Sequence, residues 1–327
     1  MEFINILLVG AGQLGSRHLQ GLKRSGMPLR IDVVDPGQES LLLAEKRFSE
    51  VAEPGAGYIV NFNRTFDTVE PLAFEVAIIA TNSDIRDRVV DQVLKRFTVK
   101  YLVLEKVAYQ SEVVYREQMQ KIKEHGVKAW INCPRRIYPF YMALRDQLAD
   151  EAHINVIVEG GNWGLGCNSI HFIDLFAYLS GGEDVRLSFS SLDEKIGESK
   201  RKGFIEFSGI LGFTGSRGKL VLIDNLGTHM PAQITITGKN KRITVNEFFR
   251  EVERRVLDTG GAETERDVQF PFQSDLTGNV VKDLIGKGEC GLTTIEESFL
   301  YHSIILNIFS EHLTKVRGYR SESCPIT

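Results

Sequence analysis

The chain has 327 residues, of which 43% are hydrophobic and 25% charged. These proportions are ordinary for soluble globular proteins and exclude a collagen, a coiled coil and a largely disordered chain. Lysine and arginine total 39 against 43 aspartates and glutamates, giving a net charge of -4, so there is no basic footprint for nucleic acid or an anionic membrane.

No apolar run approaches the roughly 20 residues that span a bilayer, and the first residues carry no basic segment typical of a secretory signal. The four cysteines lie far apart without a C-x-x-C pair, which disfavours a disulfide scaffold or a zinc site. We therefore expect a cytoplasmic protein, and its length suggests two domains.

Strand and helix signals alternate through residues 1–134. Apolar and β-branched runs predict strands at 3–9, 30–35, 75–81, 100–105 and 127–132. Helical spacing of apolar residues predicts helices at 13–25, 40–51, 85–97 and 112–125. This alternation is typical of right-handed βαβ crossovers, so we predict a dinucleotide-binding Rossmann domain with a doubly wound parallel sheet.

The pattern changes after residue 134, and residues 135–327 are predicted to form an α+β domain. Strands are expected at 153–159, 185–192, 203–213, 219–224, 233–237, 242–245 and 267–272. Helices are expected at 137–148, 168–179, 275–285 and 294–316. Strict alternation in several strands indicates an open antiparallel sheet with one buried and one wetter face and flanking helices. We assign this half to substrate binding and oligomerisation.

A G-x-G-x-x-G turn, formed by Gly10, Gly12 and Gly15, follows the first predicted strand and opens a helix. The three glycines permit a tight turn, close approach of a pyrophosphate, and close packing of helix on strand. Asp35 ends the second strand, where a carboxylate accepts hydrogen bonds from the ribose of NAD and repels the 2′-phosphate of NADP. No arginine adjoins Asp35 in sequence, so NAD is favoured. The alternative is a plain glycine turn with Asp35 as a strand-end cap.

Five short motifs, in this order, resemble those of the glucose-fructose oxidoreductase/inositol dehydrogenase (Gfo/Idh/MocA) family. They are Val9-Gly10-Ala11-Gly12-Gln13-Leu14-Gly15-Ser16-Arg17-His18, Ala80-Thr81-Asn82-Ser83-Asp84, Glu105-Lys106-Val107, Asn132-Cys133-Pro134-Arg135-Arg136 and His171-Phe172-Ile173-Asp174. The resemblance extends over essentially the whole chain. The glycine turn is common to many dinucleotide enzymes, whereas its combination with E-K and H-x-x-D is more specific.

The resemblance implies hydride transfer between NAD and a hydroxyl or keto carbon of a sugar or nucleotide-sugar substrate. The implied cofactor-binding residues are Gly10, Gly12, Gln13, Leu14, Gly15, Asp35, Thr81, Asn82, Glu105 and Lys106. The implied catalytic residues are Lys106, His171 and Asp174. Alcohol oxidation needs a base for the hydroxyl proton, and Lys106 follows a buried strand, where desolvation favours the neutral amine. The alternatives are a solvated strand-end lysine and a structural histidine.

The chain departs from the resembled pattern in three places. Asn82 and Val107 stand where the family has proline, and Cys167 stands where many of its dehydrogenases have an aspartate four residues before the histidine. Loss of that carboxylate removes one means of making the imidazole more basic. Either the substrate differs from simple polyols, or activity is weak or absent.

Further candidates for substrate binding are Arg135, Arg136, Asn162, Trp163 and Asn168, together with His171. Two guanidinium groups suit a carboxylate or phosphate on the substrate, although a salt bridge to the Rossmann domain explains them equally well. A tryptophan and an asparagine in a glycine-rich loop suit a sugar ring, although a plain flexible loop is as good an explanation.

No histidine pattern typical of a metal site is present, and nothing beyond a nearby histidine supports Cys167 as a nucleophile. Two function classes remain: an NAD-dependent sugar dehydrogenase, and a catalytically weak or inactive dinucleotide-binding regulator or partner subunit. The incompletely covered face of the second sheet predicts a homodimer or homotetramer.

Overall fold

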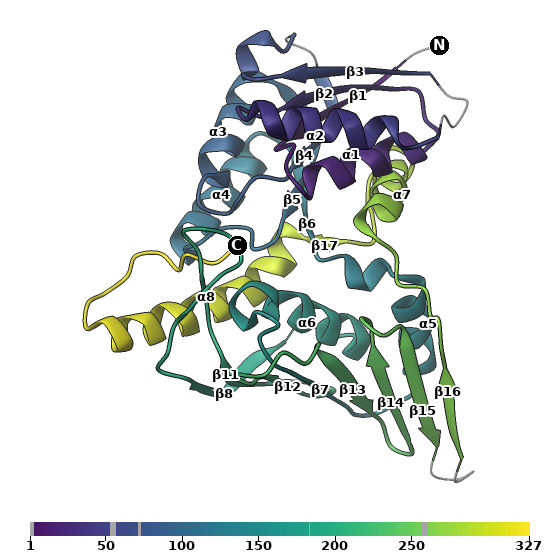
Figure 1. Ribbon diagram of the computed structural model, residues 1–327, viewed down its shortest axis with the longest axis vertical. Coiled ribbons are helices and arrows are strands. Elements are labelled where there is room, and N and C mark those ends of the chain that lie inside the picture. Colours follow the sequence, from purple (N-terminus) through teal and green to yellow (C-terminus); the bar gives the residue numbers. More distant parts are fainter. Residues whose placement is uncertain (1–2, 53–56, 71–72, 183, 257–260) are drawn as a thin grey trace. The chain divides into compact units, whose positions relative to one another are not determined.

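The structure is a computed structural model, and it describes residues 3–52, 57–70, 73–182, 184–256 and 261–327 (Figure 1). The chain divides into two compact units. The first unit comprises Met1–Tyr109, Val113–Pro134 and Pro271–Glu296, and the second comprises Gln110–Glu112, Arg135–Phe270 and Glu297–Thr327. A division follows Pro134, where the sequence placed the domain boundary. Residues 271–296, however, belong to the first unit and 110–112 to the second.

The first unit is built on a seven-stranded sheet in the order β17-β6-β5-β4-β1-β2-β3. Its strands are β1 (Ile4–Val9), β2 (Leu29–Val34), β3 (Tyr58–Asn63), β4 (Ala73–Ile79), β5 (Thr98–Glu105), β6 (Lys128–Asn132) and β17 (Thr293–Thr294). All neighbours are parallel except β17, which is antiparallel to β6. The central strands end in fully buried runs such as Ile6–Val9, as expected for a sheet covered on both faces.

The helices of this unit are α1 (Gly15–Arg24), α2 (Gln38–Ser49), α3 (Arg86–Arg96), α4 (Glu112–Glu124) and α7 (Gln273–Lys287). Each of the first four lies close to its predicted position. The predicted doubly wound sheet is therefore confirmed. Strand β3 was not predicted, because its sequence YIVNFN leaves five of six residues partly or fully exposed and gives a weak signal.

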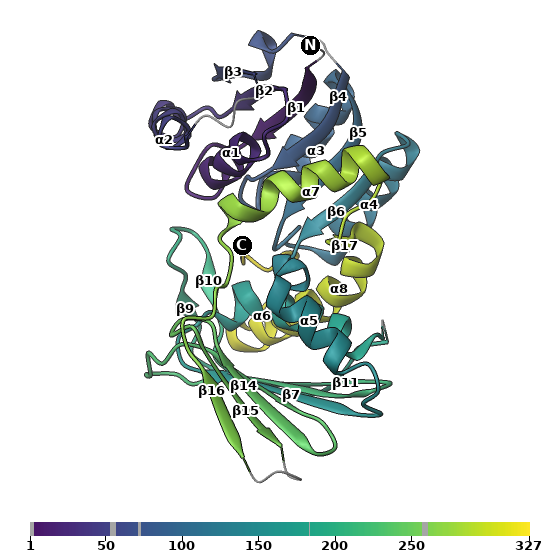
Figure 2. The same cartoon turned by 90° about the vertical axis from the view of Figure 1, so that its right-hand side faces the viewer.

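Helix α7 belongs to the first unit because its small residues pack against α1 (Figure 2). A Cβ added to Gly278 would lie 2.7 Å from the carbonyl oxygen of Gly21 and 3.0 Å from the Cβ of Ser25. A Cβ added to Gly21 would lie 2.8 Å from the Cβ of Thr277. The two helix backbones approach so closely only because these positions carry no side chain.

The second unit is built on an eight-stranded sheet in the order β16-β15-β14-β13-β7-β12-β11-β8. These strands are β7 (Ile154–Gly160), β8 (Arg186–Leu192), β11 (Gly209–Gly215), β12 (Gly218–Asp224), β13 (Gln233–Thr237), β14 (Lys241–Asn246), β15 (Glu251–Val256) and β16 (Ala262–Glu265). Strands β9 (Gly197–Glu198) and β10 (Ile205–Glu206) form a separate pair. Only β7 and β12 pair in parallel within the larger sheet, so the predicted α+β unit is confirmed.

Helices α5 (Pro139–Gln147), α6 (Leu165–Ser180) and α8 (Ile295–Arg317) lie on one side of this sheet (Figure 2). Strand β7 shows the consequence, because Ile154, Val156 and Val158 are buried while Ile157 is 42% exposed. Phe189 on β8 is 48% exposed. Apolar side chains thus remain on the other side of the sheet, and association of copies through it stays a prediction.

Residues 267–272 do not form the predicted strand, and β15 and β16 were not predicted. The sequences EVERRV and AETE place charges on both faces, which an edge hairpin tolerates and a search for apolar alternation overlooks. The predicted strand at 203–213 is divided between β10 and β11. Within the described ranges, no helix is long and apolar enough to cross a membrane.

We expect Gly278→Ala to destabilise the protein by about 1–3 kcal/mol, because the new methyl group overlaps the α1 backbone. Gly286→Ala is the matched control, since it lies on the same helix with no atom within 4 Å of an added Cβ. Both variants gain the same helix propensity, so denaturant unfolding isolates the packing cost. Equal stability of the two variants would contradict the described α1–α7 contact.

Candidate functional site

The predicted cofactor-binding residues gather at one edge of the first sheet. Strands β1, β2, β4 and β5 are parallel neighbours, so the residues that follow their carboxyl ends share this edge. The order β4-β1-β2 makes the space between β1 and β4 the switch point, where open α/β sheets bind their ligands. Gly10, Asp35, Thr81 and Lys106 follow these four strand ends.

The three glycines have three different surroundings. Gly10 has φ +93°, and a Cβ there would lie 2.9 Å from the carbonyl carbon of Ala80. A Cβ on Gly15 would lie 1.8 Å from the carbonyl oxygen of Gly10. No atom lies within 4 Å of a Cβ built on Gly12. Gly10 and Gly15 are therefore required by the fold itself, whereas Gly12 faces open space beside the start of α1.

Asp35 braces the glycine turn. Its Oδ2 accepts a hydrogen bond from the Ala11 amide at 2.7 Å, and its Oδ1 accepts one from the Gly37 amide at 2.8 Å. The carboxylate is half-buried, and each oxygen can accept more than one hydrogen bond. Asp35 thus connects the end of β2 to the turn after β1 and keeps acceptor capacity for a hydroxyl group.

Two arginines that the sequence analysis did not include lie near this turn. Arg47 of α2 donates to the carbonyl of Gln13 at 3.0 Å and to its side-chain oxygen at 2.6 Å. Arg64, which follows β3, lies 3.3 Å from the carbonyl oxygen of Pro36 through Nη2. No arginine adjoins Asp35 in sequence, but the fold places the guanidinium group of Arg64 next to the residue that follows Asp35.

The residues present fit a dinucleotide. No side chain caps the N-terminus of α1, so a phosphate at this end would meet the positive end of the helix dipole. The Thr81 Oγ1 is buried and has no hydrogen-bond partner among the described residues, although it lies beside Gly10 at the switch point. A buried hydroxyl without a partner, at the strand end next to the glycine turn, is a group that a ligand could satisfy.

Glu105 is 4% exposed and holds the centre of a buried polar network in the first unit. The Nε2 of His18 is 2.8 Å from Glu105 Oε1, and Asn132 also donates to that oxygen. The network continues through Nδ1 of His18, 3.0 Å from Thr277 Oγ1, and through Asn132 to Gln273 at 2.9 Å. This hydrogen-bond network joins α1, β5, β6 and α7 next to the turn that carries Lys106.

Burial alone would raise the pKa of Glu105, but the hydrogen bonds from His18 and Asn132 and the charge of Arg86 lower it below its usual range. Glu105 is therefore an anion fixed next to Lys106. Lys106 is itself half-buried, and the Lys106–Val107 peptide bond is cis. Apart from Glu105, which was expected to bind cofactor, the sequence analysis missed the partners in this network. His18 and Asn132 stood within the quoted motifs, whereas Thr277 and Gln273 gave no signal.

In the second unit, Asp174 and Arg136 form a buried ion pair. Arg136 donates to both carboxylate oxygens of Asp174, at 3.0 and 2.7 Å, and to Glu297 at 3.0 Å. Asp174 is 0% and Arg136 8% exposed. Burial would lower the pKa of Arg136, but the two carboxylates raise it. The structure thus shows a salt bridge, but its carboxylates belong to the second unit rather than to the Rossmann domain considered from the sequence.

Arg135 is arranged in the same way. Its guanidinium group forms a two-pronged pair with Glu247 at 2.9 and 2.7 Å, and Tyr141 donates to the same carboxylate at 2.6 Å. The guanidinium carbon also lies 4.6 Å from the centre of the Phe172 ring. Both predicted anion-binding arginines therefore have carboxylate partners in their own unit.

The loop before α6 is ordered by hydrogen bonds. Asp224 accepts from the amides of Asn162, Gly164 and Leu165. The Trp163 indole donates to the carbonyl of Ile223 at 2.8 Å, and Asn168 donates to the carbonyl of Trp163 at 2.7 Å. The loop is therefore ordered, and the flexible loop considered as an alternative from the sequence is not what the structure shows. Asn162 remains exposed, with its amide 3.1 Å from a ring nitrogen of His229.

His171 lies on α6 and is half-buried, three residues before Asp174. Cys167 is 7% exposed, with its backbone amide 3.3 Å from Glu206. A thiol buried in this way is a poor nucleophile. Both carboxylate oxygens of Asp174 accept hydrogen bonds from Arg136, and the catalytic role expected of Asp174 stays a prediction.

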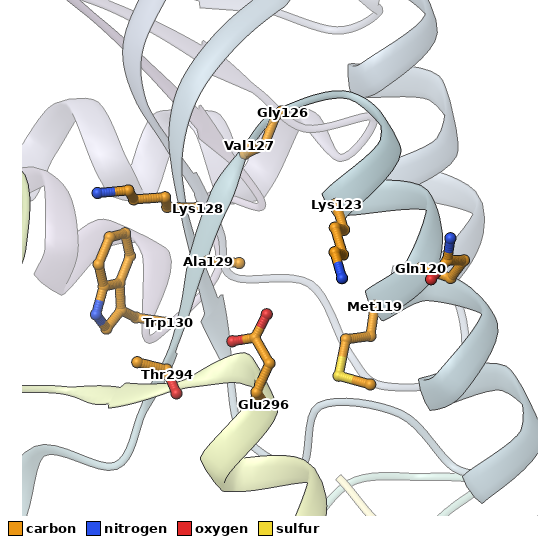
Figure 3. Close-up of a pocket in the computed structure, with 10 residues that line it drawn as sticks. All are labelled: Met119, Gln120, Lys123, Gly126, Val127, Lys128, Ala129, Trp130, Thr294 and Glu296. Carbon is orange, nitrogen blue, oxygen red and sulfur yellow. The ribbon is translucent and has the colours of Figure 1, made fainter.

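One of the larger hollows, of about 520 Å³, lies away from all the predicted site residues. It is lined by α4, β17, Glu296 and the beginning of β6, with Lys123 and Glu296 directed into it (Figure 3). This is the amino-terminal end of β6, opposite the edge where parallel sheets bind nucleotides. Among the residues that the structure describes, no three histidine, cysteine, aspartate or glutamate side chains gather to hold a metal ion.

No family model and no curated protein matches the sequence. Solved structures match the fold. An oxidoreductase of the Gfo/Idh/MocA family from Vibrio cholerae has a TM-score of 0.70 at 13% identity, covering 96% of this chain and 99% of its own. Levoglucosan dehydrogenase in complex with NADH has a TM-score of 0.70 at 14% identity, covering 96% and 98%.

A super-repressor mutant of Gal80p from Saccharomyces cerevisiae has a TM-score of 0.71 at 13% identity, covering 96% of this chain and 97% of its own. The resemblance expected from the motifs is thus confirmed at the level of the fold. Structures with this fold include both a dehydrogenase and a super-repressor mutant, so the fold alone does not indicate the function, and the residues of the site have to indicate it.

Proposed function

We propose that the chain binds NAD(H) at the carboxyl edge of its first sheet and transfers a hydride between this cofactor and a hydroxyl or keto carbon of a sugar-like substrate. The observation that carries the proposal is the open space at Gly12 beside the uncapped start of α1. The unsatisfied hydroxyl of Thr81, which follows the neighbouring strand β4, supports it. The NADH complex of levoglucosan dehydrogenase, which shares the fold, supports the choice of cofactor and substrate class.

NAD would supply the hydride acceptor or donor, and the chain has to manage the proton. Lys106 is the proposed proton carrier, because it follows the end of β5 at the ligand edge. Oε1 of the Glu105 anion beside it is engaged by His18 and Asn132, and we assign Glu105 to supporting the turn rather than to taking the proton. His171 of the second unit is the second proposed proton-transfer residue.

The proposed substrate is recognised mainly through hydroxyl groups. Arg135 and Arg136 have carboxylate partners in their own unit, which argues against their use for a substrate phosphate or carboxylate. Asn162, which is exposed on an ordered loop, is the stronger candidate for a sugar hydroxyl. Trp163 and Asn168 hold the same loop in place.

The second candidate function is dinucleotide binding without efficient catalysis, in a regulator or partner subunit. Cys167 stands where the resembled dehydrogenases have a carboxylate, and Asp174 pairs with Arg136 in a buried ion pair. The fold shared with a super-repressor mutant of Gal80p supports the same alternative.

We expect NADH to bind at least about tenfold more tightly than NADPH, because the carboxylate of Asp35 repels a 2′-phosphate. Asp35→Ser should narrow this difference, and Arg64 next to Pro36 supplies a cation for the phosphate once the carboxylate is gone. Fluorescence titrations of both cofactors at one salt concentration measure the ratio. Equal or tighter NADPH binding by the wild-type protein would contradict the role assigned to Asp35.

Lys106→Met should lower turnover by about 10²–10⁴, the usual contribution of a general acid–base group, while NADH affinity stays within a few-fold. His171→Asn should act in the same direction but less strongly, because Cys167 offers no carboxylate to support the imidazole. A panel of sugars followed at the nicotinamide absorbance identifies the substrate first. Near-normal turnover in both variants would refute the mechanism, and a wild-type protein that binds NADH without any turnover would favour the second candidate function.

A further inference from the structure

Two backbone segments of the first unit flank the ligand edge, one after β4 and one after β5. A single buried side chain joins them. Arg86, the first residue of α3, donates through Nη2 to the carbonyl of Thr81 and through Nη1 to the carbonyls of Val107 and Ala108, the latter at 2.8 Å. The sequence analysis did not single out this arginine.

A positive charge is energetically unfavourable at this buried position. Arg86 is 1% exposed, and burying a guanidinium group is unfavourable unless its donors and its charge are satisfied. It also occupies the first turn of a helix, where the helix dipole favours negative rather than positive side chains. The charge of Arg86 lowers the pKa of the buried Glu105, so that carboxylate is its nearby counter-charge. A cation kept in such a place is explained by the backbone groups that it holds.

Each of the two segments held by Arg86 contains one of the chain's departures from the resembled motifs. Asn82 and Val107 stand where the family has proline. Proline fixes the backbone angle φ at its own position, which neither asparagine nor valine does. The carbonyl just before Asn82 and the carbonyl of Val107 itself both accept from the guanidinium group.

We propose that Arg86 is a positioning residue that fixes the backbone at Thr81–Asn82 and at Lys106–Ala108, in place of the two prolines, and so holds Lys106 in register for the nicotinamide. This inference rests on the proposed function. A lysine cannot replace the arginine, because its single nitrogen cannot reach three carbonyls on two separate segments as a planar guanidinium does.

Arg86→Lys is the test variant, and Arg88→Lys is its control, since Arg88 lies exposed on the same helix and donates to the carbonyl of Asp84 at 3.2 Å. NADH affinity should fall by less than about tenfold in Arg86→Lys, because the glycine turn keeps its own contacts and Thr81 loses only its backbone support. The fluorescence change of the bound nicotinamide should fall to a small fraction of the wild-type change. Arg88→Lys should match the wild-type protein in both measurements.

Hydrogen–deuterium exchange on the protein without cofactor supplies a second readout. In Arg86→Lys, amides of residues 80–84 and 105–109 should exchange about tenfold faster, while those of β1 and β2 keep their wild-type rates. Uniformly faster exchange would show general destabilisation and would overturn the proposal. Unchanged exchange in both segments would overturn it as well.

Introducing a proline at position 107 tests directly whether Arg86 replaces it. If Arg86 replaces prolines, the Arg86→Lys defect in nicotinamide fluorescence should shrink at least about threefold in a Val107→Pro background. The same defect with and without the proline would refute the replacement. A wild-type chain that binds no NADH would refute the proposed function, and the positioning of Lys106 with it, whereas the exchange experiment still decides whether Arg86 fixes the two segments.

Discussion

The first unit depends on the satisfaction of one buried carboxylate. Glu105 ends β5 at 4% exposure, and an unpaired charge at such a depth would be very unfavourable. Its partners come from three other elements: His18 from α1, Asn132 from β6 and, through these two, Thr277 and Gln273 from α7. One requirement for hydrogen bonds therefore brings the helix of the glycine turn and a helix from a distant part of the chain to the strand end that carries Lys106.

The second unit also contains a buried charge whose partners come from several elements, but this charge is positive. Arg136 is a buried cation that is neutralised by Asp174 and Glu297, and it joins the start of α5 to α6 and α8. Several residues of the resembled motifs, among them His18, Glu105, Asn132 and Asp174, are thus partners in buried polar contacts. Their presence by itself indicates the fold more strongly than it indicates catalysis.

The local parts of this arrangement could be predicted from the sequence, and the long-range parts could not. The glycine turn and the parallel strands have short-range patterns of apolar and small residues, and both were found where expected. Arg86, Thr277 and Glu247 gave no such pattern, because each acquires its role from a partner that only the fold brings near. Helix α7 was assigned to the wrong half for a related reason, since the glycine at its contact with α1 carries no apolar signal.

The central claim is that the space at Gly12 receives the dinucleotide, and a titration of Gly12→Val with NADH tests it most directly. No atom lies within 4 Å of an added Cβ, so we expect the folded protein to accommodate the change and to keep the melting temperature of the wild type. A bound pyrophosphate would meet the new side chain, so NADH affinity should fall by at least about tenfold. Wild-type affinity for NADH in a fully folded Gly12→Val protein would contradict the account.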